Sequence, residues 1–341
     1  MSHTVKIQQH TNSITTETGQ TILDAALAAG VPYPHGCRSG NCGACKSRLK
    51  SGNISLAPYS EYALTEEEKA GGLVLACRAI PWDNVEVSWI NEGEIATHPR
   101  RKMTCQVINI TPKTHDISSV ELEIVAGGPF VYSAGQYSIV TFENQPAREY
   151  SMATMATDPF IEFHVRRVSG GKVSNFVLDS LSSGDTVLVE GPFGNSWLRE
   201  LHGGPIITLA GGSGIAPIKA IIEKALALGL KKEIRLYFGV REDRDLYLVK
   251  HFVSLTKIHP NFCFIPVLSE PGVKTKRRTG LLHNVIKEDY AVLTGSKVYL
   301  AGPPAMIEAA TKTVEKLGVT QEDIHADAFY TEAEKMTREN A

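Results

Sequence analysis

The sequence predicts three consecutive parts: an N-terminal α+β domain, a small antiparallel β-barrel and a doubly wound parallel α/β domain. Three observations predict this order. Short strands flank one amphipathic helix near the N-terminus, apolar residues then alternate from about residue 103 to 200, and apolar runs alternate with helical segments after residue 204. The predicted boundaries are 1–92, 103–203 and 204–331, with a linker over 93–102 and a tail over 332–341.

The N-terminal part has the pattern of short strands around a helix. We expect that helix over residues 21–30, because its apolar residues share one face and Gly30 can end it. The acidic stretch 65–69 (TEEEK) is interpreted as a solvated face, and the polar segment around Pro99 as the linker. The expected strands are 5–8, 13–17, 47–50, 73–77 and 85–90.

The two later parts differ in the period of their apolar residues. In the middle part, Val120, Leu122 and Ile124 repeat with period two, and short strands broken by Gly, Pro and Asn indicate an antiparallel barrel. After residue 204, apolar runs typical of buried parallel strands alternate with amphipathic segments that each end at a glycine. The expected strands are 206–210, 234–240, 262–268 and 297–301, and the expected helices are 218–229 and 305–318.

Composition excludes several classes of protein. With 43% hydrophobic and 21% charged residues, the chain can bury a core, which excludes global disorder. A net charge of −2 argues against a nucleic-acid partner that requires a large cationic surface. No apolar run approaches the roughly 20 residues that cross a membrane, and the first residues lack a signal-peptide pattern. We therefore expect a cytoplasmic protein without nucleic-acid or membrane partners.

Four of the six cysteines have the spacing of an iron–sulfur site. Cys37, Cys42 and Cys45 follow the pattern C-x4-C-x2-C, and 31 residues separate Cys45 from Cys77, which is the plant-type spacing for a 2Fe–2S cluster. Glycines in the loop permit the tight wrapping that four converging thiolates need. Structural zinc is the alternative, although zinc sites usually use two separated short pairs. Burial as small hydrophobic residues is expected for Cys105 and Cys263.

Two successive segments predict a flavin site in the middle part. In the R-x-Y-S sequence, Arg148 can neutralise a flavin pyrophosphate, Tyr150 can pack on the isoalloxazine ring, and Ser151 can offer its hydroxyl near the reactive nitrogen. Downstream, a glycine pair precedes an expected helix and can present backbone N–H groups to phosphate. The predicted flavin-binding residues of this second segment are His164, Val165, Arg166, Gly171, Lys172, Val173 and Ser174.

Two glycine-containing loops predict a dinucleotide site in the last part. The first follows the strand at 206–210 with the pattern G-x-G-x-x-P, a partial match to the dinucleotide fingerprint. The second follows the strand at 297–301, and both lie at strand ends, where open α/β sheets bind ligands. The predicted nucleotide-binding residues are Gly211, Gly212, Ser213, Gly214, Arg241, Ala301, Gly302, Pro303 and Pro304.

The donor is predicted from the residues that follow the strand at 234–240. Arg241, Glu242 and Asp243 are placed to meet an adenosine ribose. An acidic side chain here favours a free 2′-hydroxyl, whereas Arg241 can contact a 2′-phosphate. We expect NADH rather than NADPH.

In this order, the motifs resemble the ferredoxin–NADP reductase superfamily. The segments EIATHPRR, THDI, YSAGQY, REYSMA, EFHVRRVSGGKVS, LYFGVRED and HADAFY are especially similar to the reductases of Rieske naphthalene-type dioxygenases and related hydroxylases. The resemblance extends to about residue 331. It implies a β-grasp ferredoxin domain, an FAD-binding barrel and an NAD(P)H-binding α/β domain.

The resemblance also implies roles for single residues. It places FAD and NAD(P)H at the segments described above and adds Met306 to the nucleotide site. A C-terminal aromatic residue, Phe329 or Tyr330, is expected near the flavin face, so Ser151 and Phe329 are the expected catalytic residues. Many relatives have Cys where this chain has Ala301, so one contact that positions the nicotinamide is expected to be missing.

The function that the resemblance implies is electron transfer. NADH is expected to reduce FAD, a 2Fe–2S cluster to receive single electrons, and a Rieske-type oxygenase or a small ferredoxin to accept them. A diiron monooxygenase or a deoxysugar dehydratase is an alternative acceptor. A different class of function is a zinc-containing, non-catalytic module that binds flavin and nucleotide, which would lack the red-brown colour of a 2Fe–2S flavoprotein.

Overall fold

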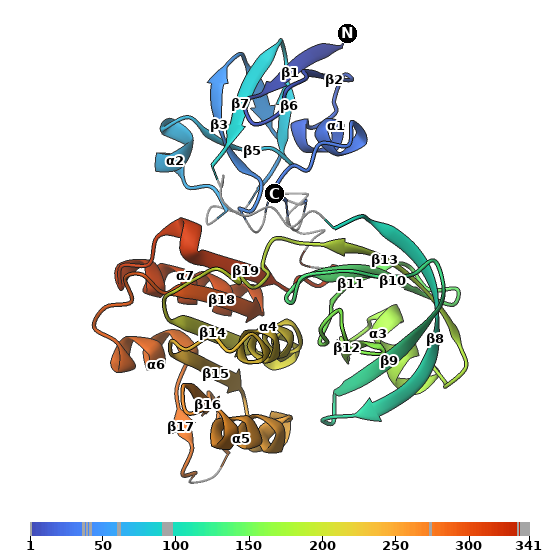
Figure 1. Cartoon of the computed structure of the whole chain (residues 1–341), viewed down its shortest axis with the longest axis vertical. Helices are drawn as coiled ribbons and strands as arrows, with labels where there is room; N and C mark the ends of the chain where they lie inside the picture. The colour runs from blue at the N-terminus through green and yellow to red at the C-terminus, as the bar shows by residue number, and fades with distance from the viewer. Residues whose placement is uncertain are drawn as a thin grey trace. The chain divides into compact units, whose positions relative to one another are not determined.

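The computed structural model describes residues 2–35, 38, 40, 43–59, 63–90, 98–272, 275–332 and 334 (Figure 1). It divides into two compact units, residues 1–97 with 330–341, and residues 98–329. The predicted barrel and α/β domain thus belong to one unit, although each has its own hydrophobic core. Within the described residues, no helix is both long and apolar enough to cross a membrane.

The N-terminal unit contains a mixed five-stranded sheet in the order β2-β1-β7-β3-β5. Its central strands β1 and β7 run parallel, and the other neighbours are antiparallel. Apolar residues of the sheet and of one helix form a single core. The elements are β1 (His3–Ile7), β2 (Ile14–Thr16), α1 (Ile22–Ala28), β3 (Lys46–Ser51), β4 (Ile54–Leu56), β5 (Leu73–Leu75), β6 (Ala79–Pro81) and β7 (Val85–Trp89).

Local sequence explains where the two helices of this unit begin. Thr21 caps α1, because its hydroxyl accepts a hydrogen bond from the N–H of Asp24. The acidic stretch forms a short helix, α2 (Glu66–Ala70), that the sequence reading did not predict. Its cause is a capping box: the Thr65 hydroxyl accepts from the Glu68 N–H, and the Glu68 carboxylate accepts from the Thr65 N–H.

The barrel is a six-stranded antiparallel sheet in the order β11-β10-β13-β8-β9-β12. In the described chain, its edge strands β11 and β12 are joined by a bridge between Met152 and Phe163, so the barrel is nearly closed. Because β8 begins at Arg101, the last two residues of the predicted linker are strand. The elements are β8 (Arg101–Pro112), β9 (Ile117–Ala126), β10 (Tyr137–Phe142), β11 (Arg148–Ser151), β12 (Ile161–Arg166), α3 (Lys172–Asp179) and β13 (Thr186–Phe193).

The α/β part is a six-stranded parallel sheet in the order β17-β16-β15-β14-β18-β19. The short strand β17 and the last strand β19 were not predicted. The chain starts at β14, builds outward to β17, and returns to β18 on the other side of β14. The strands are β14 (Ile206–Gly211), β15 (Ile234–Val240), β16 (Phe262–Leu268), β17 (Arg278–Thr279), β18 (Lys297–Gly302) and β19 (Ile324–Ala328).

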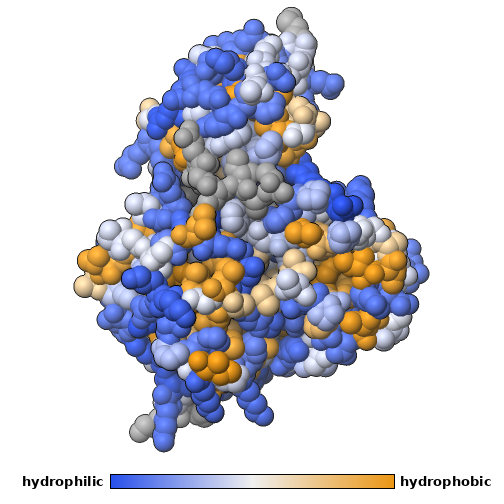
Figure 2. All heavy atoms as spheres, viewed as in Figure 1, coloured by the Kyte–Doolittle hydropathy of each residue, from blue (hydrophilic) through white to orange (hydrophobic). Residues whose placement is uncertain are grey.

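Helices cover both faces of this sheet, as the doubly wound prediction requires (Figure 1). Alternate strand residues explain why: Ile206 and Leu236 pack with α4 and α5, whereas Ile207 and Leu209 pack with α6 and α7. On the face seen in Figure 2, hydrophilic residues surround separate apolar areas. The helices are α4 (Ile215–Ala227), α5 (Val249–Ile258), α6 (Leu282–Asp289) and α7 (Pro304–Lys316), with short 3₁₀ turns η1 (Gly212–Gly214), η2 (Asp243–Asp245) and η3 (Gln321–Asp323).

Candidate functional site

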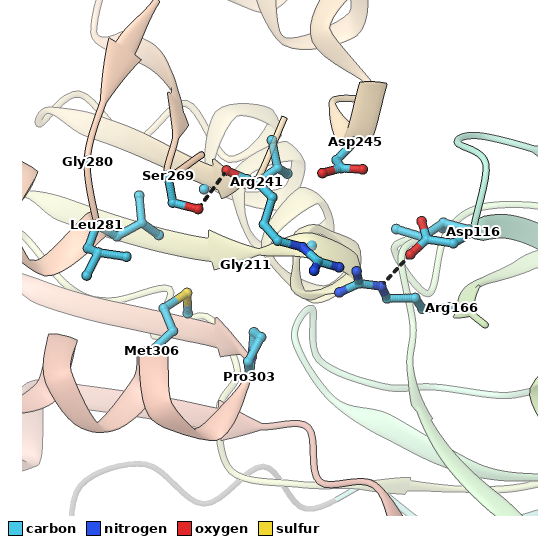
Figure 3. A pocket seen from close by; sticks show the side chains of 15 residues that line it. Asp116, Arg166, Gly211, Arg241, Asp245, Ser269, Gly280, Leu281, Pro303 and Met306 are labelled. Atoms are coloured by element: carbon cyan, nitrogen blue, oxygen red, sulfur yellow. Dashed lines mark hydrogen bonds and ion pairs between the residues drawn. The ribbon is translucent and has the colours of Figure 1, made fainter. Parts of the chain in front are cut away.

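A cavity of about 340 Å³ lies at the C-terminal ends of the parallel strands (Figure 3). Its lining combines the loop after β14, the end of β15 and the start of α7 with three barrel residues, Asp116, Ile117 and Arg166. This is the crevice where open α/β sheets bind ligands. The predicted nucleotide-binding residues that line it are Gly211, Gly212, Arg241, Pro303 and Met306.

The two glycine loops pack main chain against main chain beside the cavity. A Cβ on Gly214 would lie 2.1 Å from the Ala301 carbonyl oxygen, and one on Gly302, whose φ is +145°, would lie 2.9 Å from the first loop. Both positions therefore require glycine. At Gly212, a Cβ would meet only the Arg166 guanidinium, at 3.2 Å. The main chain of Gly212 thus faces space that a ligand can occupy.

The remaining predicted residues of these two loops lie in the main-chain turns beside the cavity or in the strand that precedes them. Ser213 lies within η1, Pro303 is the N-cap of α7, and Pro304 is in its first turn, where a missing N–H costs no hydrogen bond. Ala301 is buried in β18, and the sheet register pairs it with Asp327 of β19. Ala301 therefore lies beside an acidic residue at the sheet's end.

Arg166 was predicted to bind flavin, but its side chain lies in the nucleotide cavity. Its Nε donates to Asp116 Oδ2 at 2.8 Å, and Figure 3 shows its guanidinium close to that of Arg241. Burial would raise the pKa of Asp116, but hydrogen bonds from Arg166 and Thr114 outweigh burial and lower it. Two converging guanidinium groups beside the open main chain of Gly212 suit the pyrophosphate of a dinucleotide.

The acidic residues predicted to meet the ribose are engaged with nearby cations. Glu242 pairs with Arg244 at 3.2 Å, and Asp243 accepts from Arg277 Nε at 2.6 Å. The acidic residue that lines this end of the cavity is Asp245, which also accepts from the Glu242 N–H at 2.9 Å. Sequence reasoning missed Asp245, although its place two residues after Asp243 was a usable signal.

The predicted flavin segments face each other across the opening between β11 and β12. The Ala153 N–H donates to the Glu162 carbonyl at 2.8 Å, so the main chain of Glu162 points to this opening. Because main-chain groups alternate along a strand, those of His164 and Arg166 point the same way. Beyond the bridge at Phe163, this strip of N–H and C=O groups can hydrogen-bond the edge of a flat ring. We call this opening, between 148–153 and 162–166, the flavin slot.

The side chains of β11 have the placement that a flavin requires. Tyr150 is half-buried, with its ring 6.2 Å from both Phe142 and Phe163, and burial raises its pKa. Arg148 begins the strand and its Nη1 donates to the Ala147 carbonyl at 2.7 Å. An aromatic platform with a guanidinium two residues away fits a ring attached to a pyrophosphate.

Ser151 connects the flavin slot to the end of the parallel sheet. Its hydroxyl donates to Asp327 Oδ2 at 2.9 Å, across 176 residues of sequence. Two residues further on, the Phe329 N–H donates to the Gly302 carbonyl at 2.9 Å, which fixes Phe329 beside the second nucleotide loop. Asp327 was missed by sequence reasoning. Its only signal was its position inside HADAFY, two residues before the predicted aromatic.

The ring of His164 does not face the slot. Its Nε2 is 3.0 Å from Glu162 Oε1 and its Nδ1 is 3.0 Å from the Tyr247 hydroxyl, and the side chain is fully buried. Burial lowers the pKa of His164, although Glu162 opposes the shift. The side chain of Val165 is likewise buried in the barrel core. Any contact of these two residues with flavin must therefore come from the main chain.

The glycine pair leads into α3 as predicted. Gly171 is its N-cap, and within the described chain no side chain caps its first turn, which leaves N–H groups for an anion. Lys172 begins the helix and adds a positive charge. The Ser174 hydroxyl instead accepts from the Val168 N–H at 3.0 Å, and Val173 packs into the barrel core. The end of this helix thus fits a phosphate group.

The predicted cluster ligands are described for two of the four cysteines. Cys45 and Cys77 are both buried, and the Cys77 N–H donates to Cys45 Sγ at 3.5 Å. Cys37 and Cys42 lie outside the described residues. Gly40 and Gly43 have φ of +76° and +70°, the left-handed conformation that a tightly wrapped loop needs. Two thiols brought together from distant segments, with a main-chain N–H directed to sulfur, fit an iron–sulfur ligand set.

Three further predictions about single residues have different outcomes. Cys105 is buried, which raises its pKa to about 12, as expected of a core residue. Cys263 is exposed, so its predicted burial is wrong. Glu68 of the acidic stretch is not solvated, because its carboxylate accepts from Lys46 Nζ at 2.6 Å and only 14% of its side chain is exposed.

Family comparisons match a separate domain to each of the three predicted parts of the chain. The chain matches a 2Fe-2S iron-sulfur cluster binding domain over residues 5–81, an oxidoreductase FAD-binding domain over 104–197 and an oxidoreductase NAD-binding domain over 208–312. These matches confirm the predicted cofactor classes and, with the sheets described above, the predicted fold class.

Similar proteins extend over nearly the whole chain. A Pseudomonas putida naphthalene 1,2-dioxygenase system reductase component is 35% identical over 95% of this chain and 98% of its own length. The reductase subunit of an Amycolatopsis aromatic O-demethylase is 38% identical over 92% and 95%. The crystal structure of an Amycolatopsis cytochrome P450 reductase has a TM-score of 0.77, with 36% identity over 96% of this chain and 98% of that one.

A structure titled as the ferredoxin reductase in carbazole 1,9a-dioxygenase has a TM-score of 0.69, with 27% identity over 97% of this chain and 99% of that one. Each of these relatives combines high coverage with a reductase title. The chain therefore belongs to the family of NAD-dependent iron–sulfur flavoprotein oxidoreductases that form the reductase components of bacterial oxygenase systems.

Proposed function

We propose that this protein passes electrons from NADH through FAD and a 2Fe–2S cluster to an aromatic-ring-hydroxylating oxygenase, directly or through a small ferredoxin. The observation that carries the proposal is the hydrogen bond from Ser151 to Asp327, 2.9 Å long, together with that from Phe329 to Gly302. These contacts bring the flavin slot to the end of the nucleotide-binding sheet. A hydride donor and its acceptor need this proximity.

Different residues of the chain would bind FAD and the 2Fe–2S cluster. Bound FAD would accept a hydride and release its two electrons one at a time. Arg148 and the first turn of α3 would hold its pyrophosphate, Tyr150 would support the ring, and the Ser151 hydroxyl would be oriented by Asp327 toward the ring's reactive edge. Cys45 and Cys77, with Cys37 and Cys42, would ligate the cluster.

We assign the nucleotide pyrophosphate to Arg166, Arg241 and the main chain of Gly212 rather than assigning Arg166 to flavin. The support is the location of both guanidinium groups in one cavity. For the ribose, Asp245 lines the cavity, and its carboxylate would hydrogen-bond a free 2′-hydroxyl and repel a 2′-phosphate. The position of Asp245 therefore favours NADH over NADPH. Arg241 acts in the opposite direction, because a guanidinium group can bind a 2′-phosphate.

The acceptor class is proposed from the named relatives. The naphthalene dioxygenase system components, at 35% and 37% identity, favour a ring-hydroxylating dioxygenase. A cytochrome P450 is a second candidate, since the Amycolatopsis O-demethylase subunit is 38% identical and a P450 reductase matches with a TM-score of 0.77. We place the protein in the cytoplasm, where NADH is supplied and where thiols such as Cys45 and Cys77 stay reduced.

The test is anaerobic reduction of purified acceptors by the holoprotein with NADH. A ring-hydroxylating oxygenase, a plant-type ferredoxin and a cytochrome P450 are offered separately at equal concentration. We expect the oxygenase or the ferredoxin to be reduced at least tenfold faster than the P450. Faster reduction of the P450 would replace the proposed acceptor, and no reduction of any acceptor despite a bleached flavin would contradict transfer to oxygenases.

A further inference from the structure

A buried lysine joins the nucleotide-binding half of the larger unit to the flavin slot. Lys219 lies in the second turn of α4, and 12% of its side chain is exposed. Its Nζ donates to the Ala153 carbonyl at 2.9 Å and to Glu223 Oε2 at 3.0 Å, and lies 3.8 Å from Glu162 Oε2. Ala153 and Glu162 border the flavin slot, but the side chains of Lys219, Glu162 and Glu223 have no role in the cofactor contacts described above.

The contact continues as a chain of buried polar groups. Glu162 Oε1 is 3.0 Å from His164 Nε2, and His164 Nδ1 is 3.0 Å from the Tyr247 hydroxyl. Tyr247 belongs to the nucleotide-binding half, in the segment between η2 and α5. Burial would raise the pKa of Glu162, but His164 and Lys219 outweigh burial and lower it. The strand β12 is thus held from the other half at two points, Lys219 and Tyr247.

Lys219 lies where helix α4 meets both sides of the flavin slot. Ala153 lies two residues after Ser151, which ends β11, and Glu162 lies on β12, so one ammonium group contacts both sides of the flavin slot. Helix α4 itself begins at the η1 loop, whose Gly212 faces the nucleotide cavity. A single side chain therefore connects α4 to both sides of the flavin slot.

A gain in folding stability does not by itself explain why a buried lysine pairs with carboxylates here. Replacing a buried ion pair by apolar residues of similar volume is often neutral or stabilising, because desolvation offsets the attraction between charges. Directional contacts do fix geometry, and hydride transfer depends on it: the reacting atoms must approach to about 3–3.5 Å, and a misplacement of about 1 Å can slow a reaction roughly a hundredfold.

We infer that Lys219 is a positioning residue that sets the approach of the nicotinamide to the flavin by holding both sides of the slot to α4. The inference rests on the proposed function, since it assumes that FAD occupies the slot and NADH the cavity. It predicts that loss of the ammonium group changes the rate of flavin reduction more than it changes binding of either cofactor.

The test is stopped-flow reduction of the flavin in the Lys219→Met holoprotein over a range of NADH concentrations. We expect the limiting rate to fall at least tenfold, with the dissociation constant for NADH within threefold of wild type and the FAD content unchanged. Lys219→Arg, which keeps a donor cation, should recover the rate to within about threefold. The matched control is Lys224→Met on the same helix, whose partner is Glu200 at 3.4 Å; its rate should equal that of wild type.

A second variant covers the case in which Lys219→Met does not fold. Glu162→Gln keeps the volume of the β12 side chain but removes the charge that faces Lys219, and it should slow flavin reduction at least threefold with FAD retained. Wild-type rates in the variants would overturn the inference, as would loss of FAD as their main effect, because the network would then be structural. A wild-type flavin that NADH does not reduce would refute the proposed function and the inference with it.

Discussion

The two units of the molecule differ in how their functional residues are distributed along the chain. In the N-terminal unit, three of the four predicted ligands fall within nine residues, 37–45. In residues 98–329, Ser151 meets Asp327 across 176 residues, and Arg166 of the barrel lines a cavity of the α/β part. The first kind of site can be recognised from spacing, whereas the second exists only after β12, β15 and β19 have been brought together by folding.

The largest effect is expected from removing one cluster ligand. Cys77→Ser should lower NADH-driven reduction of cytochrome c at least a hundredfold, because single electrons leave through the cluster. Flavin reduction by NADH, followed by absorbance under anaerobic conditions, should stay within twofold of wild type, since its residues belong to the other unit. Loss of flavin reduction in this variant would break the distinction between the two units.

Within the larger unit, the variant Arg166→Ala tests whether Arg166 binds NADH or FAD. A hydrogen bond to a charged group contributes about 1.5–3 kcal/mol, so the dissociation constant for NADH should rise roughly ten- to hundredfold. FAD content should not change, and an NADH titration with an FAD assay on the same sample measures both. If FAD were lost while NADH binding was kept, Arg166 would belong to the flavin, as the sequence alone had predicted.

Asp327→Ala tests the long-range contact itself. Without the carboxylate, the Ser151 hydroxyl is free to rotate, so the limiting rate of flavin reduction should fall about tenfold, equivalent to one charged hydrogen bond. Asp323→Ala is the matched control, because Asp323 pairs with Lys297 at 2.8 Å and not with a flavin-slot residue. Equal rates in the two variants would remove Asp327 from the site.

The smallest expected effect is on how the Tm depends on pH. The pKa of Glu162 is lowered in the folded protein from its ordinary value of 4.5, because contacts with His164 and Lys219 outweigh burial. Its contribution to stability is therefore present above pH 4.5 and is lost as the pH falls through the lower folded value. Glu162→Gln should lower the Tm at neutral pH, and the difference from wild type should shrink as the pH falls below 4.5.

The counterpart in the N-terminal unit is Glu86, with 26% of its side chain exposed against 10% for Glu162. Hydrogen bonds from Gln8 and Lys6 lower its pKa as well, but solvent screens Glu86 more than it screens Glu162. Glu86→Gln should therefore change the Tm little at either pH. A larger effect for Glu86 than for Glu162 would contradict the weight given to the buried network.

Much of the fold follows from local signals. Period-two alternation predicted the barrel, and apolar runs predicted β14, β15, β16 and β18, because burial imposes those patterns directly. The strands that were missed, β17 and β19, lie at the two edges of the sheet, where burial is partial and the pattern weak. The helix α2 was missed because its five residues include no buried apolar side chain.

The site residues, like the secondary structure, could be predicted only where a local sequence signal exists. The glycines at 212 and 302 were predicted because a special backbone conformation demands that residue type. His164 was predicted to bind flavin, yet its ring turns to Glu162 and Tyr247, and the contact with Tyr247 arises only when the two halves of the unit come together. Asp245 and Asp327 were missed for a related reason: their only signal was a position two residues from a predicted residue, and the sequence does not show which acidic side chain near a strand end faces a site.

The central claim is that one pathway joins the nucleotide cavity, the flavin slot and the cluster site. Its most direct test is an anaerobic titration of the purified holoprotein with NADH, and separately with NADPH, followed by absorbance. We predict that NADH bleaches the flavin and the iron–sulfur bands together and that NADPH requires at least tenfold higher concentration. Bleaching of the flavin alone, in protein shown by analysis to contain iron and sulfide, would contradict it.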